Sequence, residues 1–388
     1  MAFTVFLHPK DSRAIAQGHP WVYREAIAEK PVKLKAGQVV EVAGPGRPFL
    51  GRGIFDPGSS IAVRVWTRRD GERIDDAMIE ARLRAAVALR ETMRIGERTT
   101  AWRIANAEGD GLPGVIVDRF GDWLAVTLQS DALRSWGEPI VAALVRAVPA
   151  RGIYLRSDEE SLLVAGKACP AEFEVSEPSV RCLVSLAEAG KPGLFPDLRE
   201  ARSVLAPLCA KRRVLNLFAH TGAFSAMAAA AGAREVASVD LSARYLDVAR
   251  RNVELNAPGY AAHETIAADA FETLSRMASQ KRDFDVIVCD PPSFSTSKKG
   301  AFSVKDDYRP LARAALRVLA PHGIVCFSTN FRGVGREQFL RLLHDGAEME
   351  QRQLRVLTVI GQPADFPVLP IMSDASYLHF AICASVPG

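Results

Sequence analysis

The chain contains 388 residues with a formal net charge of +4, and 48% of the residues are hydrophobic and 24% charged. These values are ordinary for a globular protein of two or three domains, and the small positive charge permits a polyanionic partner without requiring one. The six cysteines form no CxxC pair and no His–Cys cluster. This pattern argues against a disulfide framework and a metal site, and it suits the cytoplasm. The N-terminus carries charge too early for a secretory signal, and no apolar run approaches a membrane span, so we expect no membrane contact.

Residues 1–70 contain short apolar runs separated by glycine and proline, a pattern typical of a small β-barrel. The run "IAVRVWT" places Ile61, Val63 and Val65 on one side and the residues between them on the other. This alternation has the period of a strand that is buried on one face only. We therefore expect Arg64 and Trp66 to face outward.

Residues 71–179 read as a connecting helix followed by a small α+β domain. The helix is predicted in "IDDAMIEARLRAAVALRETMRI", where apolar residues share one face: Ile79, Leu83, Ala86, Leu89 and Met93. The stretch "DGLPGVIVDRFGDWLAVTLQ" is typical of a hairpin, because two apolar runs flank a polar turn. A helix near residues 135–146 and a strand in "GIYLRS" complete this segment.

Residues 180–388 alternate apolar runs with helical segments, which predicts a parallel, doubly wound, Rossmann-like sheet of the α/β class. The strands are expected in "RVLNLFA", "EVASVD", "HETIAAD", "FDVIVCD" and "GIVCFST". The last two runs, "QLRVLTVIG" and "ASYLHFAICA", are expected to pair as an antiparallel edge.

The turn "FAHTGAF" after the first of these strands points to a nucleotide-like ligand that lacks phosphates. A dinucleotide site needs three glycines for its pyrophosphate, whereas this turn has Gly222 alone. S-adenosylmethionine fits, because it joins adenosine to a sulfonium and carries no phosphate. Asp240 is placed to accept the ribose hydroxyls, and Asp269 to accept the adenine amino group. A single aspartate at a strand end can equally be a helix N-cap, but three in succession (with Asp290) favour a site.

The stretch "DPPSF" ends the fourth strand and is the predicted acceptor site. Two prolines stiffen the turn, which leaves Asp290 and Pro292 at the cleft and Phe294 available to stack on a base. We assign the catalytic role to these three residues. The following segment is polar and basic, and Lys298 and Lys299 are either part of a solvated loop or contacts to RNA phosphates.

From end to end, the chain resembles the bacterial large-subunit (23S) ribosomal RNA methyltransferases of the RlmI and RlmK kind. "HPWVYREAI" and "RGIFDPGSSIAVRVWT" resemble their N-terminal PUA domain, a small RNA-binding barrel, and "IYLRSD" resembles their middle domain. "GKPGLFPDLREAR" resembles their lead-in to a class I methyltransferase domain, usually K-T-G-x-x-x-D-Q-R, although Pro192 and Leu198 depart from it.

The resemblance implies S-adenosylmethionine as cofactor and ribosomal RNA as partner, and leaves a homodimer open. It adds Phe195, Asp197 and Arg199 to the cofactor site. The predicted cofactor contacts are then Phe195, Asp197, Arg199, Asn216, Phe218, His220, Thr221, Gly222, Asp240, Leu241, Asp269, Ala270 and Asp290. The predicted RNA contacts are Lys298, Lys299, Arg332, Trp21 and Arg24, and Trp21 can equally be a core residue.

The family divides by the atom that it methylates. Cytosine C5 has no free lone pair, so its methylation needs a cysteine thiolate that adds to C6. The cytosine-type relatives carry that cysteine in "FSCS", where this chain has Thr329 in "FSTN", and Cys289 and Cys326 read as buried strand residues. "DPPSFSTSK" and "FSTNFRG" are closer to the guanine-N7 members, whereas "ADFPVLP" resembles the cytosine branch.

Guanine N7 is therefore the favoured acceptor, and cytosine C5 is the alternative. Two hypotheses assign the chain to other classes of protein. A nicotinamide-dependent oxidoreductase is disfavoured by the missing glycines. A non-catalytic RNA-binding or ribosome-assembly protein is disfavoured by the intact series of strand-end aspartates.

Overall fold

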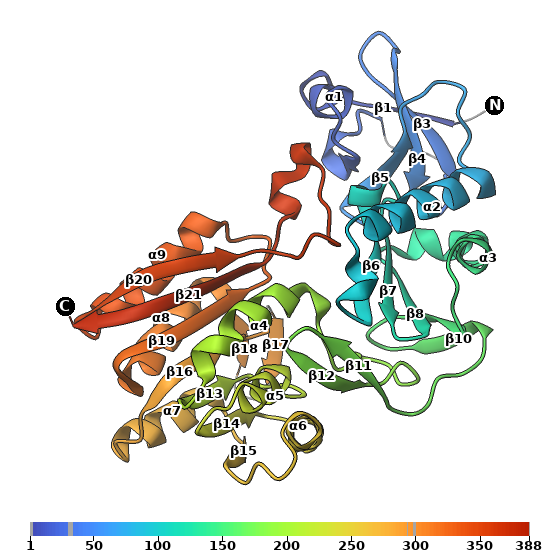
Figure 1. Ribbon diagram of the computed structural model, residues 1–388. Helices are drawn as coiled ribbons and strands as arrows, with labels where there is room; N and C mark the ends of the chain where they lie inside the picture. The colour runs from blue at the N-terminus through green and yellow to red at the C-terminus, as the bar shows by residue number, and fades with distance from the viewer. Residues whose placement is uncertain (1–2, 30–33, 293, 298–299, 388) are drawn as a thin grey trace. The chain divides into compact units, whose positions relative to one another are not determined.

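The computed structural model describes residues 3–29, 34–292, 294–297 and 300–387 (Figure 1). The chain divides into two compact units, and it passes between them several times. Unit 1 comprises Met1–Glu172, Ser185–Lys191 and Ala364–Ser373, and unit 2 comprises Phe173–Val184, Pro192–Pro363 and Asp374–Gly388.

The predicted N-terminal barrel is present in unit 1. Its sheet has the order β1-β3-β4-β5-β2, with β1 parallel to β3 and the other neighbours antiparallel. A bridge between Leu7 and Ile27 links the segments that follow the two edge strands, β1 and β2. The elements are β1 (Phe3–Phe6), α1 (Pro9–Ala16), β2 (Trp21–Tyr23), β3 (Val39–Ala43), β4 (Phe49–Phe55) and β5 (Ile61–Thr67).

The expected one-sided burial of β5 is wrong. Arg64 and Trp66 are buried, as are the residues on the opposite face of the strand. Trp66 packs into the core formed with the following helix, and Arg64 forms an ion pair with Glu108. The second face of β5 is thus covered by a later part of unit 1, which a local pattern cannot reveal.

The rest of unit 1 contains the connecting helix and the predicted α+β elements, including the expected hairpin of β7 and β8. The sheet has the order β10-β9-β8-β7-β6. The elements are α2 (Asp76–Thr92), β6 (Ala101–Asn106), β7 (Val115–Phe120), β8 (Trp123–Leu128), α3 (Gly137–Ala147), β9 (Gly152–Arg156) and β10 (Ser161–Gly166).

One residue of the predicted buried face of α2 is misplaced. Leu89 is exposed, and the neighbouring Arg90 is buried instead. Arg90 is held there by an ion pair with Asp110 at 2.5 Å and by a hydrogen bond to the carbonyl oxygen of Asp365. A buried charge requires such partners, and they lie far away in the sequence.

Unit 2 contains the doubly wound sheet, which confirms the predicted fold. The strand order is β15-β14-β13-β16-β19-β21-β20, with β13 to β16 and β19 parallel and β21 antiparallel to both its neighbours. The predicted antiparallel edge is confirmed. The strands are β13 (Arg213–Leu217), β14 (Glu235–Asp240), β15 (His263–Ala267), β16 (Phe284–Cys289), β19 (Leu319–Thr329), β20 (Arg352–Ile360) and β21 (His379–Pro387).

Helices cover both faces of this sheet. One face packs against α7, α8 and α9 in a large apolar core, and on the other face α5 and α6 pack together with a hairpin of β11 and β12. The remaining elements are β11 (Phe173–Glu177), β12 (Val180–Val184), α4 (Arg199–Leu205), α5 (Ala223–Ala230), α6 (Ala243–Asn256), α7 (Ala270–Ser279), β17 (Phe294–Ser297), β18 (Gly300–Ser303), α8 (Val304–Arg317) and α9 (Arg336–Glu348).

Candidate active site

The turn between β13 and α5 has a strained backbone. Phe218, His220 and Gly222 have φ values of 57°, 49° and 74°, a region that only glycine enters without cost. A Cβ on Gly222 would also lie 2.5 Å from the Cβ of Ala249 in α6. The glycine is therefore required by backbone conformation and by the close approach of α6, whatever the ligand.

Asp240 at the end of β14 holds this turn in place. Its Oδ2 accepts a hydrogen bond from the backbone N–H of His220 at 2.8 Å, and its Oδ1 accepts one from Ser242 at 2.9 Å. Each carboxylate oxygen keeps a lone pair for a further donor. The next residue, Leu241, is 62% exposed, so an apolar side chain stands uncovered beside the carboxylate.

Two other predicted cofactor residues have structural roles. Asp269 is the N-cap of α7, because its Oδ1 accepts hydrogen bonds from the backbone of Phe271 and Glu272, and Ala270 is buried in the first turn. The amide of Asn216 is buried and donates to Ser225 at 2.9 Å. Its side chain therefore supports the turn from within the core.

The predicted lead-in segment lies against the same turn. Thr221 donates to the carbonyl oxygen of Gly193. The ring of Phe195 lies 5.2 Å from that of His220, which in turn lies 4.2 Å from Tyr245. Aromatic and polar side chains from separate elements thus gather around the turn after β13.

A buried ion pair that the sequence analysis missed anchors this segment. Arg202 donates to both carboxylate oxygens of Glu177, at 2.7 and 2.8 Å, and to the carbonyl oxygen of Phe195 at 2.7 Å. Arg202 lies within the quoted "DLREAR", but no local signal identified Glu177 in β11 as its partner. Arg199 is also buried.

Asp197 connects this segment to the C-terminal strands. Its Oδ2 accepts a hydrogen bond from the hydroxyl of Tyr377 at 2.9 Å. The guanidinium of Arg332, a predicted RNA contact, lies 5.9 Å from the ring of the same tyrosine. The structure thus brings Arg332 to the edge of the site.

Asp290 follows β16 and is the predicted acceptor carboxylate. Its pKa is raised to about 6, mainly by burial and to a smaller degree by the nearby charge of Asp197, while Ser328 and Arg202 act in the opposite direction. Pro292 is exposed. Phe294 begins β17, and its predicted stacking role stays a prediction. Lys298 and Lys299 lie outside the described residues.

Thr329 ends β19 at the position where a nucleophilic cysteine was considered, and its side chain is buried. Its hydroxyl oxygen accepts a hydrogen bond from the backbone of Phe331 at 3.3 Å. Cys289 and Cys326 lie inside β16 and β19, and burial raises the pKa of both thiols. All six cysteines, each of them a described residue, are buried.

In unit 1, the two predicted RNA contacts are engaged with protein groups. The indole N–H of Trp21 donates to Oε1 of Glu108 at 2.7 Å. The Arg24 guanidinium donates to the carbonyl oxygens of Pro57 and Ser59 at 2.5 Å. Trp21 is partly buried and Arg24 exposed. Their contact with RNA stays a prediction.

The chain matches two family models: an S-adenosylmethionine-dependent methyltransferase over residues 144–380 and a PUA-like domain over residues 5–68. A ribosomal RNA large subunit methyltransferase I of Pseudoalteromonas atlantica is 32% identical and aligns over 99% of both chains. The chain belongs to the S-adenosylmethionine-dependent methyltransferases.

A second relative agrees with this chain in length, and two solved structures agree with it in fold. The ribosomal RNA large subunit methyltransferase I of Klebsiella pneumoniae is 32% identical over 96% of this chain and 95% of its own. The crystal structure of SMU.776, a candidate methyltransferase complexed with SAH, is 25% identical with a TM-score of 0.92 and covers 98% of this chain and 100% of its own. A candidate methyltransferase from Streptococcus mutans has the same fold, with a TM-score of 0.90 at 24% identity.

The residues of this methyltransferase fit its cofactor. Asp240 retains acceptor capacity for ribose hydroxyls beside the exposed Leu241. Asp197 and Asp290 repel each other electrostatically, as the raised pKa of Asp290 indicates, and a cationic sulfonium would relieve that repulsion. Among the described residues, no group of three histidine, cysteine or acidic side chains could hold a metal ion. Within the same residues, no helix is long and apolar enough to cross a membrane.

Proposed function

We propose that the chain transfers a methyl group from S-adenosylmethionine to a base of 23S ribosomal RNA, with guanine N7 as the first candidate atom. The RNA substrate is supported by relatives named for the large-subunit RNA that align over nearly the whole length of both chains. The PUA-like match at the N-terminus supports it as well. Such a substrate would place the protein in the cytoplasm.

The choice of acceptor atom rests on the burial of the cysteines. Addition to cytosine C6 requires an accessible thiolate. Cys289 and Cys326 are fully buried, their thiol pKa values are raised by burial, and Thr329 replaces the cysteine of the cytosine-type relatives. Guanine N7 has an exposed lone pair and needs no covalent adduct, so positioning alone supplies much of the rate.

Asp290 suits the same reaction. When bound, S-adenosylmethionine supplies a methyl group activated by its sulfonium. A purine that accepts a methyl group at N7 gains positive charge, and a carboxylate held beside it stabilises that charge. Asp290 stands at the end of β16, where the predicted acceptor cleft begins, and Phe294 follows in β17. We assign Asp290 to the acceptor and Asp240 to the ribose.

Methylation of unmodified 23S ribosomal RNA in vitro tests the proposal. Purified protein and S-adenosylmethionine should yield 7-methylguanosine on digestion and mass spectrometry. 5-Methylcytidine, together with a denaturation-resistant adduct on RNA that contains 5-fluorocytosine, would move the assignment to cytosine C5. RNA binding without any methyl transfer would instead favour the assembly role.

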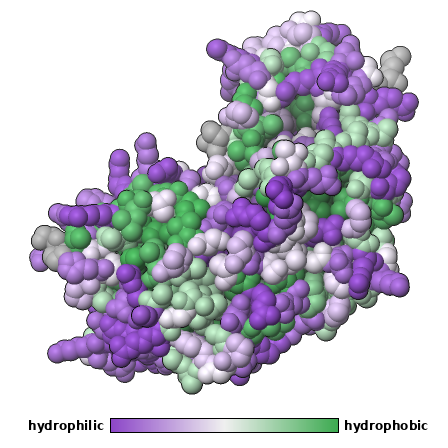
Figure 2. Space-filling view, viewed as in Figure 1, coloured by the Kyte–Doolittle hydropathy of each residue, from purple (hydrophilic) through white to green (hydrophobic). Residues whose placement is uncertain are grey.

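A homodimer stays a prediction that the C-terminal strands allow us to test. Figure 2 shows hydrophobic residues gathered over β20 and β21, and Val356 and Leu357 are 45% and 56% exposed. β20 is an edge strand, and within the described residues no strand pairs with its outer side. A second copy that added its own β20 would cover this edge. Sedimentation should then show a dimer that Leu357→Lys dissociates.

A further inference from the structure

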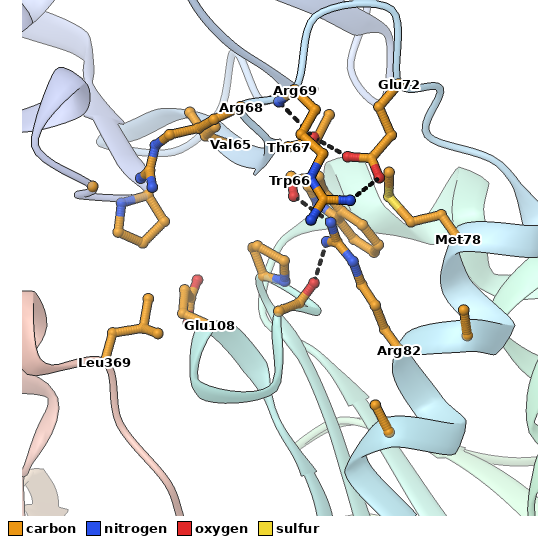
Figure 3. A pocket seen from close by; sticks show the side chains of 16 residues that line it. Val65, Trp66, Thr67, Arg68, Arg69, Glu72, Met78, Arg82, Glu108 and Leu369 are labelled. Atoms are coloured by element: carbon orange, nitrogen blue, oxygen red, sulfur yellow. Dashed lines mark hydrogen bonds and ion pairs between the residues drawn. The ribbon is translucent and has the colours of Figure 1, made fainter.

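Unit 1 contains a cavity of about 560 Å³ that the sequence analysis did not anticipate (Figure 3). Its walls come from Gly18 and Pro20, from the end of β5 and the residues after it, from α2, from the turn after β6 and from Leu369. Ala81 and Ala85 lie one turn apart on α2, and their small side chains leave space on the side of the helix that lines the cavity. The volume is in the range that holds a nucleotide-sized ligand.

Trp66 presents a hydrogen-bond donor without a partner. Its side chain lines the cavity and is only 4% exposed, yet its indole N–H makes no hydrogen bond. A buried indole normally finds an acceptor, because an unmade hydrogen bond is costly. The nitrogen itself is enclosed by protein atoms, so what Trp66 offers the cavity is an apolar aromatic wall.

Arg68 presents a positive charge without a counter-ion. It follows β5, lines the cavity and has no hydrogen-bond or ion-pair partner among the described residues. Burial alone lowers the pKa of its guanidinium, with no carboxylate acting in the opposite direction. In Figure 3 its side chain points away from the side where Glu72 and Arg82 lie. An anionic group is the natural partner for such an arginine.

The other charged groups of the wall are already engaged. Arg82 donates to the carbonyl oxygens of Gly111 and Trp66. Glu72 accepts from Thr67 and lies 3.9 Å from the Arg69 guanidinium. Glu108, also in the wall, accepts from Trp21 and Arg64. The charged group left to recognise a ligand is therefore the Arg68 cation, which stands beside an apolar floor.

We propose that this cavity is a nucleotide subsite that takes one nucleotide of the RNA substrate outside the methyl-transfer site. Arg68 binds the phosphate, and the Trp66 side chain forms part of the apolar wall beside the base. The apolar floor accommodates the planar ring. The inference rests on the proposed function in one respect only, namely that RNA is the source of the nucleotide.

Two variants and a matched control test the subsite in the full chain. Arg68→Gln removes the cation, and Trp66→Phe replaces the indole of the apolar wall with a smaller aromatic ring. Arg98→Gln changes an exposed arginine of the same unit that does not line the cavity. The affinity of each protein is measured for a labelled single-stranded oligoribonucleotide, and for AMP and adenosine by NMR titration.

We expect the wild type and Arg98→Gln to bind AMP more tightly than adenosine, and Arg68→Gln to lose that preference. Arg68→Gln should bind the oligoribonucleotide about tenfold more weakly, with a salt slope that is smaller by about one. Trp66→Phe should weaken both AMP and adenosine. Because Arg68 is exposed, its replacement tests the subsite even if Trp66→Phe does not fold.

Equal RNA and AMP affinities in wild type and Arg68→Gln would overturn the subsite. If AMP binding depends on Arg68 but neither variant changes the affinity for RNA, the cavity binds a free nucleotide and RNA is not the source of the ligand. The proposed function is judged separately, by methyl transfer to 23S ribosomal RNA. If the binding tests exclude the subsite and methyl transfer is observed, the proposed function stands. If the binding tests support the subsite and methyl transfer is absent, the subsite stands and the proposed function does not.

Discussion

The two halves of the proposed active site hold their carboxylates in different ways. The cofactor half consists of Asp240 and the turn 218–222, and the acceptor half consists of Asp290 and Thr329 at the ends of β16 and β19. Asp240 accepts two backbone hydrogen bonds. Burial, together with the nearby charge of Asp197, raises the pKa of Asp290 to about 6.

The same sequence pattern places one aspartate among backbone N–H donors and the other in a buried position. Each aspartate ends or follows an apolar parallel strand. Hydrogen bonds from N–H groups stabilise the charged form of a carboxylate, whereas burial destabilises it. The cofactor half thus fixes its carboxylate by backbone hydrogen bonds, whereas the acceptor half holds a buried carboxylate with a raised pKa.

The largest effect is expected at the buried ion pair of Glu177 and Arg202, which anchors the segment beside the cofactor half. Glu177→Ala leaves Arg202 buried without its partner, and the loss of one member of a buried ion pair costs about 3–5 kcal/mol. Urea denaturation should show this loss of unfolding free energy. The double variant Glu177→Leu with Arg202→Leu is the control and should be more stable than the single variant. A loss below about 1 kcal/mol in Glu177→Ala would contradict the anchoring role.

The acceptor half is tested by Asp290→Asn, which keeps the shape of the side chain and removes its charge. Turnover should fall by about 10²–10³-fold, as it does when one preorganised electrostatic contact is lost. Affinity for S-adenosylmethionine should fall by only about tenfold. Steady-state kinetics and calorimetric titration measure the two quantities. The N-cap variant Asp269→Asn is the control, and equal turnover in both variants would remove Asp290 from the chemistry.

Most of the fold could be predicted from the sequence, because strand and helix alternation is a local property. The positions of β14, β15 and β16 follow from apolar runs that end near aspartates. The antiparallel C-terminal edge was predictable for the same reason. The middle hairpin of β7 and β8 needed only a polar turn between two apolar runs.

The remainder depends on partners distant in the sequence. The second buried face of β5 depends on Glu108 and α2, and the burial of Arg90 depends on Asp110 and on residue 365. The function of Asp269 as a cap could be suspected from the sequence but not separated from a ligand role. The cavity beside Trp66 could not be predicted, because its walls come from five separate segments.

The cofactor half is tested directly by Asp240→Ala. The change removes the acceptor of the ribose hydroxyls and releases the backbone N–H groups of His220 and Ser242. Charge-assisted hydrogen bonds contribute about 1.5–3 kcal/mol each, so affinity for S-adenosylmethionine should fall by about tenfold to hundredfold. An unchanged dissociation constant in a folded variant would exclude Asp240 from the ribose site.

The raised pKa of Asp290 predicts a pH dependence of cofactor affinity. Above about pH 7 the carboxylate is ionised and attracts the sulfonium, and as the pH falls through 6 it becomes protonated and neutral. Affinity for S-adenosylmethionine should therefore fall by about tenfold between pH 7.5 and 5. Calorimetric titration across this range should show the fall in wild type and a nearly flat profile in Asp290→Asn. A fall of the same size in the variant would assign the titration to another group.

The smallest effect is expected at Cys326, and it separates direct transfer from covalent catalysis. The thiol is buried in β19 with a raised pKa, so it is a packing group and a poor nucleophile. Cys326→Ala should cost about 1 kcal/mol of unfolding free energy and leave turnover close to that of wild type. Cys289→Ala is the matched variant in β16 and should behave alike. If either folded variant lost all activity, a cysteine would be required in the acceptor half, and the methyl group would be assigned to cytosine C5.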